Sequence, residues 1–262
     1  MKKFNKKSLG QNFLFDKNII KKIINLVEIE KKNIIEIGPG EGALTDEIIK
    51  QKPKLVYCIE KDNFLSKKLN IKYSQNKNVQ IINADILKFN LEKLKIDNSI
   101  IFGNLPYNIS SQILVKILNF KKWPPNYSDV IFMFQKELGE KILGKFQTKN
   151  YGRISILSNY RLLPKTKFIV SPNCFFPKPK VDSIIIHFKP KLKNFSNIKN
   201  MQNLEKVTNI LFSNKRKIIK KNIKKILDQK KIKQLNFLNL GLRPSEIKPD
   251  DYYKITELFE KG

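Results

Sequence analysis

The sequence contains few residues of the types that hold metals or form disulfides. Among its 262 residues are two cysteines and one histidine, and Cys58 and Cys174 are not spaced as a metal site. We therefore expect a reducing compartment and no bound metal. No run approaches the ~20 apolar residues of a membrane span, and the start MKKFNKKS lacks the apolar stretch of a secretory signal. These absences predict a cytoplasmic protein that does not enter a membrane.

Acidic residues are scarce as well. The chain has 23 of them against 52 basic residues, which gives a net charge of +29. Such an excess goes beyond what solubility requires and indicates a polyanionic partner such as nucleic acid. Only four of the basic residues are arginine, however, and a chain rich in Lys, Asn and Ile can also come from an A-rich coding sequence. Charge alone therefore leaves both explanations open.

Short apolar runs alternate with helical patterns between residues 33 and 134. The patterns predict strands at 33–37, 55–59, 79–83, 99–102 and 130–134, with helices such as 43–50 and 110–119 between them. This alternation predicts a parallel sheet covered on both faces, to which residues 183–188 add a late strand. Helical periodicity follows Pro190, and the polar, basic stretch 189–200 is typical of a linker. We expect one domain over residues 1–190 and a helical domain over residues 191–262.

A glycine-rich turn follows the first predicted strand, in the sequence EIGPGEG. Glycine at the C-terminal end of a parallel strand lets the backbone pass close to a ligand. The dinucleotide fingerprint is G-x-G-x-x-G, whereas Gly38, Gly40 and Gly42 form G-x-G-x-G, with an acidic residue two positions before the first glycine. The difference disfavours a pyrophosphate ligand and favours S-adenosylmethionine, which has no phosphate.

Two carboxylates follow the next two predicted strands. Glu60 ends the second strand, where it can accept hydrogen bonds from both ribose hydroxyls, and Asp85 follows the third, where it can accept from an adenine amino group. Either residue alone could simply cap a strand end. Together with the glycine turn, they predict a cofactor that carries a nucleoside.

The fourth predicted strand leads into IFGNLPYN, residues 101–108. The side-chain oxygen of Asn104 and the carbonyl of Leu105 could hold both hydrogens of a purine amine and free its lone pair for attack. Pro106 fixes the turn. Tyr107 offers a face on which a flipped-out base stacks. Alignment of the amine with a sulfonium methyl would supply most of the rate, with no general base.

Six segments in order resemble motifs of the KsgA-type rRNA adenine N6-dimethyltransferases, and the resemblance runs essentially end to end. They are LGQNFL (9–14), EIGPGEGALT (36–45), GNLPYNIS (103–110), FMFQKELGEKI (132–142), FFPKPKVDS (175–183), and LFSNKRKIIKKN (211–222) with GLRPSEI (241–247). The departures are mild: Lys178 stands where many relatives carry proline.

The resemblance implies a Rossmann-like, class I S-adenosylmethionine-dependent methyltransferase fold with a small all-α C-terminal domain. It implies a monomer that dimethylates N6 of two adjacent adenosines near the 3' end of small-subunit rRNA during small-subunit biogenesis. Phe175 would be the second aromatic, opposite Tyr107, that flanks the target base. The catalytic turn would be Asn104, Leu105, Pro106 and Tyr107, and the cofactor contacts Asn12, Leu14, Gly38, Gly40, Glu60, Asp85 and Asn104.

Three alternatives remain at this stage. The erythromycin-resistance methyltransferases share fold and chemistry but act on large-subunit rRNA, and they typically carry Ile at the position of Leu105. The mitochondrial transcription factor B proteins bind promoters; the absence of a long Arg- and Ser-rich transit segment before the first motif disfavours them. A non-catalytic assembly factor is disfavoured because Asn104, Pro106 and Tyr107 are all intact.

A strongly basic segment lies in the predicted helical domain. Apolar residues recur at helical spacing from Ser213 to Leu227, which predicts an amphipathic helix with one face in the core. No acidic residue interrupts it, and we expect its outward face to bind RNA phosphates. The residues predicted to do so are Lys215, Arg216, Lys217, Lys220, Lys221 and Lys224. Lys2, Lys3, Lys6 and Lys7 are predicted to contribute in the same way.

Overall fold

A computed structural model describes residues 12–94, 96–192 and 197–261 of the chain. Within it the chain forms two compact units. Of the described residues, unit 1 comprises 12–94, 96–116, 124–139 and 163–190, and unit 2 comprises 117–123, 140–162, 191–192 and 197–261. The expected contiguous domains 1–190 and 191–262 therefore differ from these units, because two segments that precede residue 190 pack with the C-terminal helices.

Unit 1 is built on a seven-stranded sheet with the strand order β4-β3-β2-β5-β6-β9-β7. Strands β2 to β6 run parallel to their neighbours, and β9 pairs antiparallel with β6. Their bounds are β2 Asn33–Ile37, β3 Leu55–Glu60, β4 Val79–Asn83, β5 Ser99–Asn104, β6 Tyr127–Gln135, β7 Leu162–Val170 and β9 Ser183–Pro190. The central strands form because side chains on both faces are buried, such as Ile34 and Ile100 on one face and Ile35 and Ile101 on the other. The predicted parallel sheet is thus confirmed, with the late strand antiparallel.

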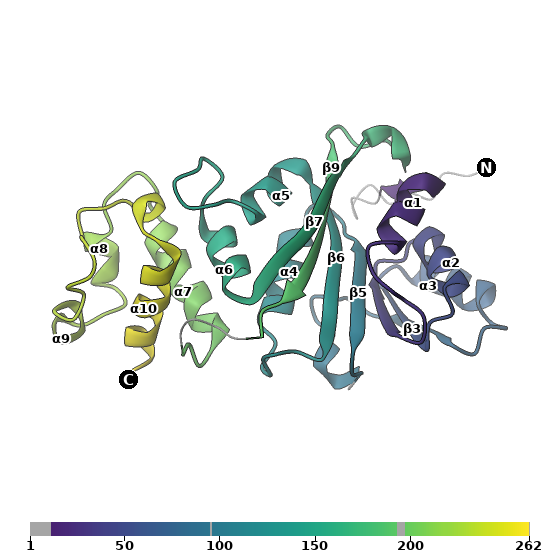
Figure 1. Cartoon of the computed structure of the whole chain (residues 1–262), viewed down its shortest axis with the longest axis horizontal. Coiled ribbons are helices and arrows are strands. Elements are labelled where there is room, and N and C mark those ends of the chain that lie inside the picture. The colour runs from purple at the N-terminus through teal and green to yellow at the C-terminus, as the bar shows by residue number, and fades with distance from the viewer. Residues whose placement is uncertain (1–11, 95, 193–196, 262) are drawn as a thin grey trace. The chain divides into compact units, whose positions relative to one another are not determined.

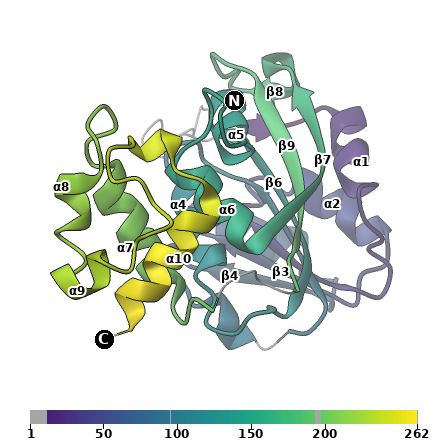
Figure 2. The ribbon, with the colours of Figure 1, turned by 60° about the vertical axis from the view of Figure 1, so that its left-hand side comes forward.

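Helices cover both faces of this sheet. Figures 1 and 2 show α1 (Lys17–Ile24) and α2 (Ala43–Lys50) on one side and α4 (Ser110–Leu118) on the other. The helix α3 (Asn63–Lys72) begins at Asp62, whose carboxylate accepts from the N–H groups of Phe64 and Leu65. The short strands β1 (Phe13–Leu14) and β8 (Phe175–Phe176) pair antiparallel in a separate two-stranded sheet. A further helix, α5 (Lys136–Ile142), follows β6.

Unit 2 consists of helices. Figure 1 shows α7 (Met201–Phe212) beside α10 (Pro249–Glu260), and stacked rings of Phe212 and Tyr252 join them, with centroids 5.7 Å apart. The helix α6 (Arg153–Arg161) joins this pair through the ion pair from Arg153 to Glu205 at 2.9 Å. Two single-turn helices, α8 (Lys220–Ile223) and α9 (Gln229–Ile232), lie between α7 and α10 in the sequence.

The continuous basic helix predicted from Ser213 to Leu227 is wrong. Helix α7 ends at Phe212, and the next helical residues are Lys220–Ile223. The buried side chain of Asn222 donates to the carbonyl of Leu211 and to Oγ of Ser213, both at 3.4 Å, and so fastens a turn at this point. Lysines four residues apart also repel one another along a helix, which periodicity alone does not reveal.

Candidate functional site

The carboxyl ends of β2 and β5 meet where the strand order reverses. From β2 the chain continues outward to β3 and β4, whereas β5 continues to β6 on the other side. Ligands of open α/β sheets bind at such a switch point. A cavity of about 760 Å³ lies there, lined by the turns after β2 and β5, the end of β3, and β1. Its volume falls within the range of about 300–1,000 Å³ that is typical of ligand sites.

The glycine turn lines this cavity. Gly38 and Gly40 have φ angles of 69° and 61°, which favour glycine, and both belong to the lining. Gly40 is also held close to the N-terminal strand, because a Cβ at this position would come within 2.8 Å of the Phe13 ring. At Gly40 the turn can therefore pass close to β1 only because this position carries no side chain.

Glu60 fastens the same turn. Its carboxylate accepts from the N–H of Gly40 at 3.2 Å and from the N–H of Asp62 at 2.8 Å. Burial raises the pKa of Glu60, and the two N–H donors oppose that shift. Glu60 lines the cavity at the end of β3.

Asp85 lies outside the set of residues that line the cavity. Its carboxylate forms an ion pair with Lys61 at 2.8 Å and accepts from the N–H of Leu87 at 2.9 Å. The Lys61 ammonium lowers the pKa of Asp85. The structure thus brings Glu60 to the glycine turn and gives Asp85 a different partner.

All four residues of the predicted catalytic turn, Asn104 to Tyr107, line the cavity. Nδ2 of Asn104 donates to the backbone oxygen of Asn12 at 3.1 Å, so the atom of this amide that can accept from a substrate is Oδ1. Asn12 and Leu14 line the cavity as well. The predicted residues Leu9, Gly10 and Gln11 and the N-terminal lysines lie outside the described residues.

Tyr107 is held by a residue that the sequence did not single out. Its hydroxyl lies 2.5 Å from Oγ of Ser183, which is fully buried at the start of β9. Burial raises the pKa of Tyr107, so the hydroxyl stays protonated. The ring is therefore tied to the sheet at its polar end. In the sequence, Ser183 is the last residue of the FFPKPKVDS motif, and nothing there indicated a contact with Tyr107.

The Phe175 side chain does not line the cavity. Its side chain is 3% exposed and packs in the core with Leu14 and Val170, whereas Phe176 is 60% exposed and lines the cavity. Successive residues of a strand point to opposite faces, so β8 turns only one of the two phenylalanines toward a ligand. The predicted stacking residue Phe175 thus lies in the core, and Phe176 is the one of the two phenylalanines that lines the cavity.

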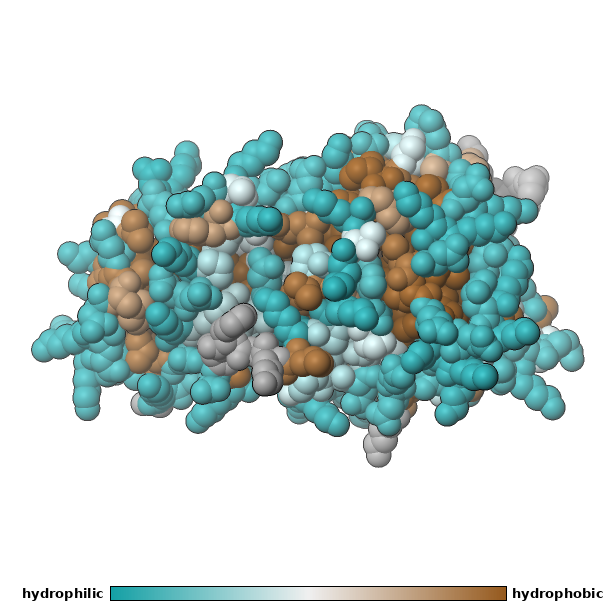
Figure 3. All heavy atoms as spheres, viewed as in Figure 1, coloured by the Kyte–Doolittle hydropathy of each residue, from teal (hydrophilic) through white to brown (hydrophobic). Residues whose placement is uncertain are grey.

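Two further phenylalanines at the cavity were missed. Phe15 and Phe64 are 57% and 58% exposed, and both line the cavity. Figure 3 shows apolar atoms, coloured brown, gathered between α1 and β5, the elements next to β1 and the catalytic turn. Neither residue follows a periodic pattern or belongs to a motif, so the sequence offered no signal for them.

A buried acid lies beneath the glycine turn. Glu36, on β2, is 2% exposed, lines the cavity and accepts from the Thr45 hydroxyl at 2.6 Å. Burial raises the pKa of Glu36 to about 7. The sequence pattern included this acid but gave no sign of its depth.

The basic residues predicted to bind RNA in the segment Ser213–Leu227 are exposed on unit 2. Lys215 and Arg216 lie in a turn and Lys217 in a bend, Lys220 and Lys221 begin α8, and Lys224 follows its last residue. Over the described part of the chain, no group of three His, Cys, Asp or Glu side chains could hold a metal ion. Within the same residues, no helix is long and apolar enough to cross a membrane.

Comparisons with known proteins give one family. The model of the ribosomal RNA adenine dimethylase family matches residues 2–261. The ribosomal RNA small subunit methyltransferase A of Pelagibacter ubique is 42% identical to the chain, with 97% of each protein covered. The protein of the same name from Malacoplasma penetrans is 39% identical, with 96% of this chain and 91% of that protein covered.

Solved structures show the same fold. A dimethyladenosine transferase from Plasmodium falciparum superposes with a TM-score of 0.75 at 24% identity, covering 93% of this chain and 95% of the other. The 23S rRNA methyltransferase ErmE gives a TM-score of 0.67 at 23% identity, covering 95% of this chain and all of the other. The Rossmann-like methyltransferase fold is thereby confirmed. With its family model matched over nearly every residue, the chain belongs to the ribosomal RNA adenine dimethylase family, whose members are methyltransferases.

Proposed function

We propose that this enzyme transfers methyl groups from S-adenosylmethionine to N6 of two adjacent adenosines near the 3' end of small-subunit rRNA. The observation that carries the proposal is that the glycine turn, Glu60 and the Asn104–Tyr107 turn line one cavity. The relatives named above as small-subunit methyltransferases support this choice of subunit. Within the proposal, the reaction takes place on the small subunit or its precursor in the cytoplasm.

The residues around the cavity fit the proposed cofactor. The backbone at Gly38 and Gly40 leaves room for a ligand, and Glu60 offers a carboxylate to ribose hydroxyls at the end of β3. Asn12 and Leu14 close the cavity from β1. Asp85 would recognise the adenine amino group only after its carboxylate turns away from Lys61. When bound, the cofactor supplies an electrophilic methyl group on a sulfonium.

The catalytic turn prepares the target amine. Oδ1 of Asn104 and the carbonyl of Leu105 accept its two hydrogens, which directs the nitrogen lone pair toward the methyl group. Tyr107 and Phe176 stack on the base, a contact worth about 1–3 kcal/mol for each base. Alignment of the two substrates supplies the rate, and the proton of the new ammonium passes to water.

The exposed basic residues of unit 2 bind the RNA backbone in this proposal. Phosphate contacts position an RNA without reading its sequence. Lys215, Arg216, Lys217, Lys220, Lys221 and Lys224 offer such contacts.

Labelled S-adenosylmethionine and undermethylated small subunits test the proposal. We expect label in N6,N6-dimethyladenosine on small subunits and none on large subunits. Label on large subunits instead would favour the erythromycin-resistance activity. No label on either, with the cofactor bound, would favour a binding role without catalysis.

Asn104→Ala tests the role of the turn. Loss of one preorganised hydrogen-bonding group from a transition state costs on the order of 10²-fold in kcat. We expect a loss of at least that size with rRNA binding unchanged, because the amide acts on the target amine. Asn108→Ala, which alters an exposed neighbour in the same turn, is the matched control and should retain activity. Near-full turnover by Asn104→Ala would contradict the mechanism.

A further inference from the structure

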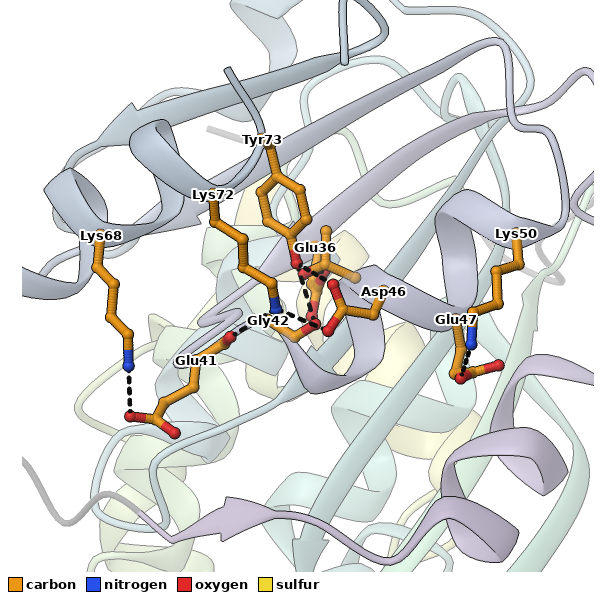
Figure 4. Close-up of polar contacts among 10 residues, drawn as sticks. Glu36, Glu41, Gly42, Asp46, Glu47, Lys50, Lys68, Lys72 and Tyr73 are labelled. Atoms are coloured by element: carbon orange, nitrogen blue, oxygen red, sulfur yellow. Dashed lines mark hydrogen bonds and ion pairs between the residues drawn. The ribbon is translucent and has the colours of Figure 1, made fainter. Parts of the chain in front are cut away.

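Side chains at the end of α3 reach back to the glycine turn. Figure 4 shows Lys68, Lys72 and Tyr73 projecting from this helix end toward Glu41, Gly42 and Asp46. Glu41 and Gly42 complete the glycine turn, and Asp46 lies in the first turn of α2. All of these residues belong to unit 1. The contacts span about 30 residues of sequence, and Lys68, Lys72 and Tyr73 belong to none of the motifs.

Tyr73 makes the most buried of these contacts. Its hydroxyl lies 3.1 Å from the carbonyl oxygen of Gly42 and 2.7 Å from Oδ1 of Asp46. The Tyr73 side chain is 8% exposed, and burial raises the pKa of its hydroxyl far above the usual value. The hydroxyl therefore remains a hydrogen-bond donor over the whole physiological pH range.

Lys72 holds the same two segments from the solvent side. Its ammonium lies 2.6 Å from Oδ2 of Asp46 and 3.2 Å from the carbonyl oxygen of Glu41. Lys68 adds an ion pair with the Glu41 carboxylate at 3.0 Å. Exposed ion pairs each contribute little, because solvent screens them. The buried Tyr73 contact is accordingly the main one, and Lys72 assists it.

The shape of the turn fits this contact. Gly42 has a φ of 85°, and a Cβ at this position would come within 2.3 Å of the Tyr73 hydroxyl. Tyr73 thus occupies the space that glycine leaves. Because a trans peptide is planar, holding the Gly42 carbonyl also fixes the orientation of the N–H of the next residue, Ala43, which lines the cavity.

We propose that Tyr73, assisted by Lys72, is a positioning residue that sets the affinity for S-adenosylmethionine by holding the glycine turn in its binding conformation. The inference rests on the proposed function, since it takes the glycine turn as the cofactor's binding surface. Tyr73 lies outside the residues that line the cavity and acts through Gly42 and Asp46. It should therefore change the binding of the cofactor and leave the transfer itself intact.

The test compares Tyr73→Phe with Tyr57→Phe, a matched change on β3. Both retain the ring and remove one hydroxyl. A hydrogen bond contributes about 0.5–1.5 kcal/mol, which corresponds to a two- to tenfold change in affinity. We expect Tyr73→Phe to raise the Kd for S-adenosylhomocysteine and the KM for S-adenosylmethionine by about fivefold, with kcat at saturating cofactor unchanged. Tyr57→Phe should match the wild type in all three.

A second variant guards against a purely structural explanation. Lys72→Met should raise the same Kd by about twofold, and the double variant should exceed either single one. If Tyr73→Phe lowers only the melting temperature, with wild-type Kd and KM, the positioning role is wrong. If kcat falls while KM stays constant, it is wrong as well. If the wild type itself does not bind S-adenosylhomocysteine, the proposed cofactor site fails first.

Discussion

The hydroxyl of Tyr107 and Oγ of Ser183 lie 2.5 Å apart, although 76 positions separate them in the sequence. Ser183 is fully buried at the first position of β9, and β9 pairs with β6 across the sheet. A buried strand of the sheet therefore holds the ring proposed to stack on the target base. A stacking ring that is held in place loses less conformational entropy when the base arrives.

Ser183→Ala should lower kcat without changing the affinity for the cofactor. The change removes the hydrogen bond to the half-buried Tyr107 hydroxyl. Loss of such a partner costs about 1–3 kcal/mol of the free energy that holds the ring in place. Tyr107→Phe should cost a similar amount, because it removes the other end of the same contact. Methylation kinetics of both variants and their double variant measure the coupling. The double variant should be no worse than the worse single one, and fully additive losses would show that the contact is unimportant.

The two neighbouring phenylalanines of β8 should respond in opposite ways. Phe176→Ala removes an exposed ring at the cavity, so we expect kcat/KM to fall about ten- to a hundredfold, in line with lost stacking, at unchanged stability. Phe175→Ala removes a buried ring, so the free energy of unfolding should fall by about 3–5 kcal/mol. Urea denaturation and methylation assays on both variants measure this. A stable, inactive Phe175→Ala would restore Phe175 as the stacking residue.

Phe175 and Phe176 also show which parts of the fold and of the site could be predicted from the sequence and which could not. The strands of the sheet could be predicted because long runs such as Ile100 to Phe102 are buried on both faces, and burial leaves a pattern. The glycine turn, Glu60 and the Asn104–Tyr107 turn followed from their places after those strands. The pairing of β1 with β8 spans two residues in each strand, which is too short to leave a pattern, and it decides which phenylalanine faces the cavity.

Other features depend on side chains that meet only in the fold. Lys61 reaches Asp85, Tyr73 reaches Gly42, and each pair is more than 20 residues apart. No spacing rule connects them. The prediction of a helix in the basic segment failed for a different reason. Its apolar residues do recur at helical spacing, but the lysines repel one another and the Asn222 side chain stabilises a turn, so no continuous helix forms.

Neutralising the basic segment should weaken rRNA binding in a salt-dependent way. The test variant combines four substitutions, Lys215→Gln, Lys217→Gln, Lys220→Gln and Lys221→Gln. Each phosphate contact that is lost reduces the slope of the logarithm of the rRNA-binding constant against the logarithm of the salt concentration by about 0.7–0.9. If all four contacts are lost, we therefore expect the slope to fall by about 2.8–3.6, with cofactor affinity unchanged. Binding of rRNA measured across a salt series checks this. Lys31, Lys54 and Lys77, exposed on unit 1, provide a control with a similar loss of charge. An equal effect in the control would assign the binding to net charge alone.

Glu36 should make stability depend on pH. Its pKa rises from 4.5 in the unfolded chain to about 7 in the fold, so the folded protein binds this proton more tightly. The free energy of unfolding therefore falls as the pH rises between these two values and levels off above the upper one. At about 1.4 kcal/mol for each pKa unit, the loss amounts to roughly 3 kcal/mol.

Glu36→Gln keeps an acceptor for the Thr45 hydroxyl and carries no charge, so it should lose this dependence. Urea denaturation from pH 5 to pH 8 compares the two proteins, with Glu28→Gln at an exposed site as control. Parallel curves for the wild type and Glu36→Gln would mean that Glu36 keeps its charge in the fold.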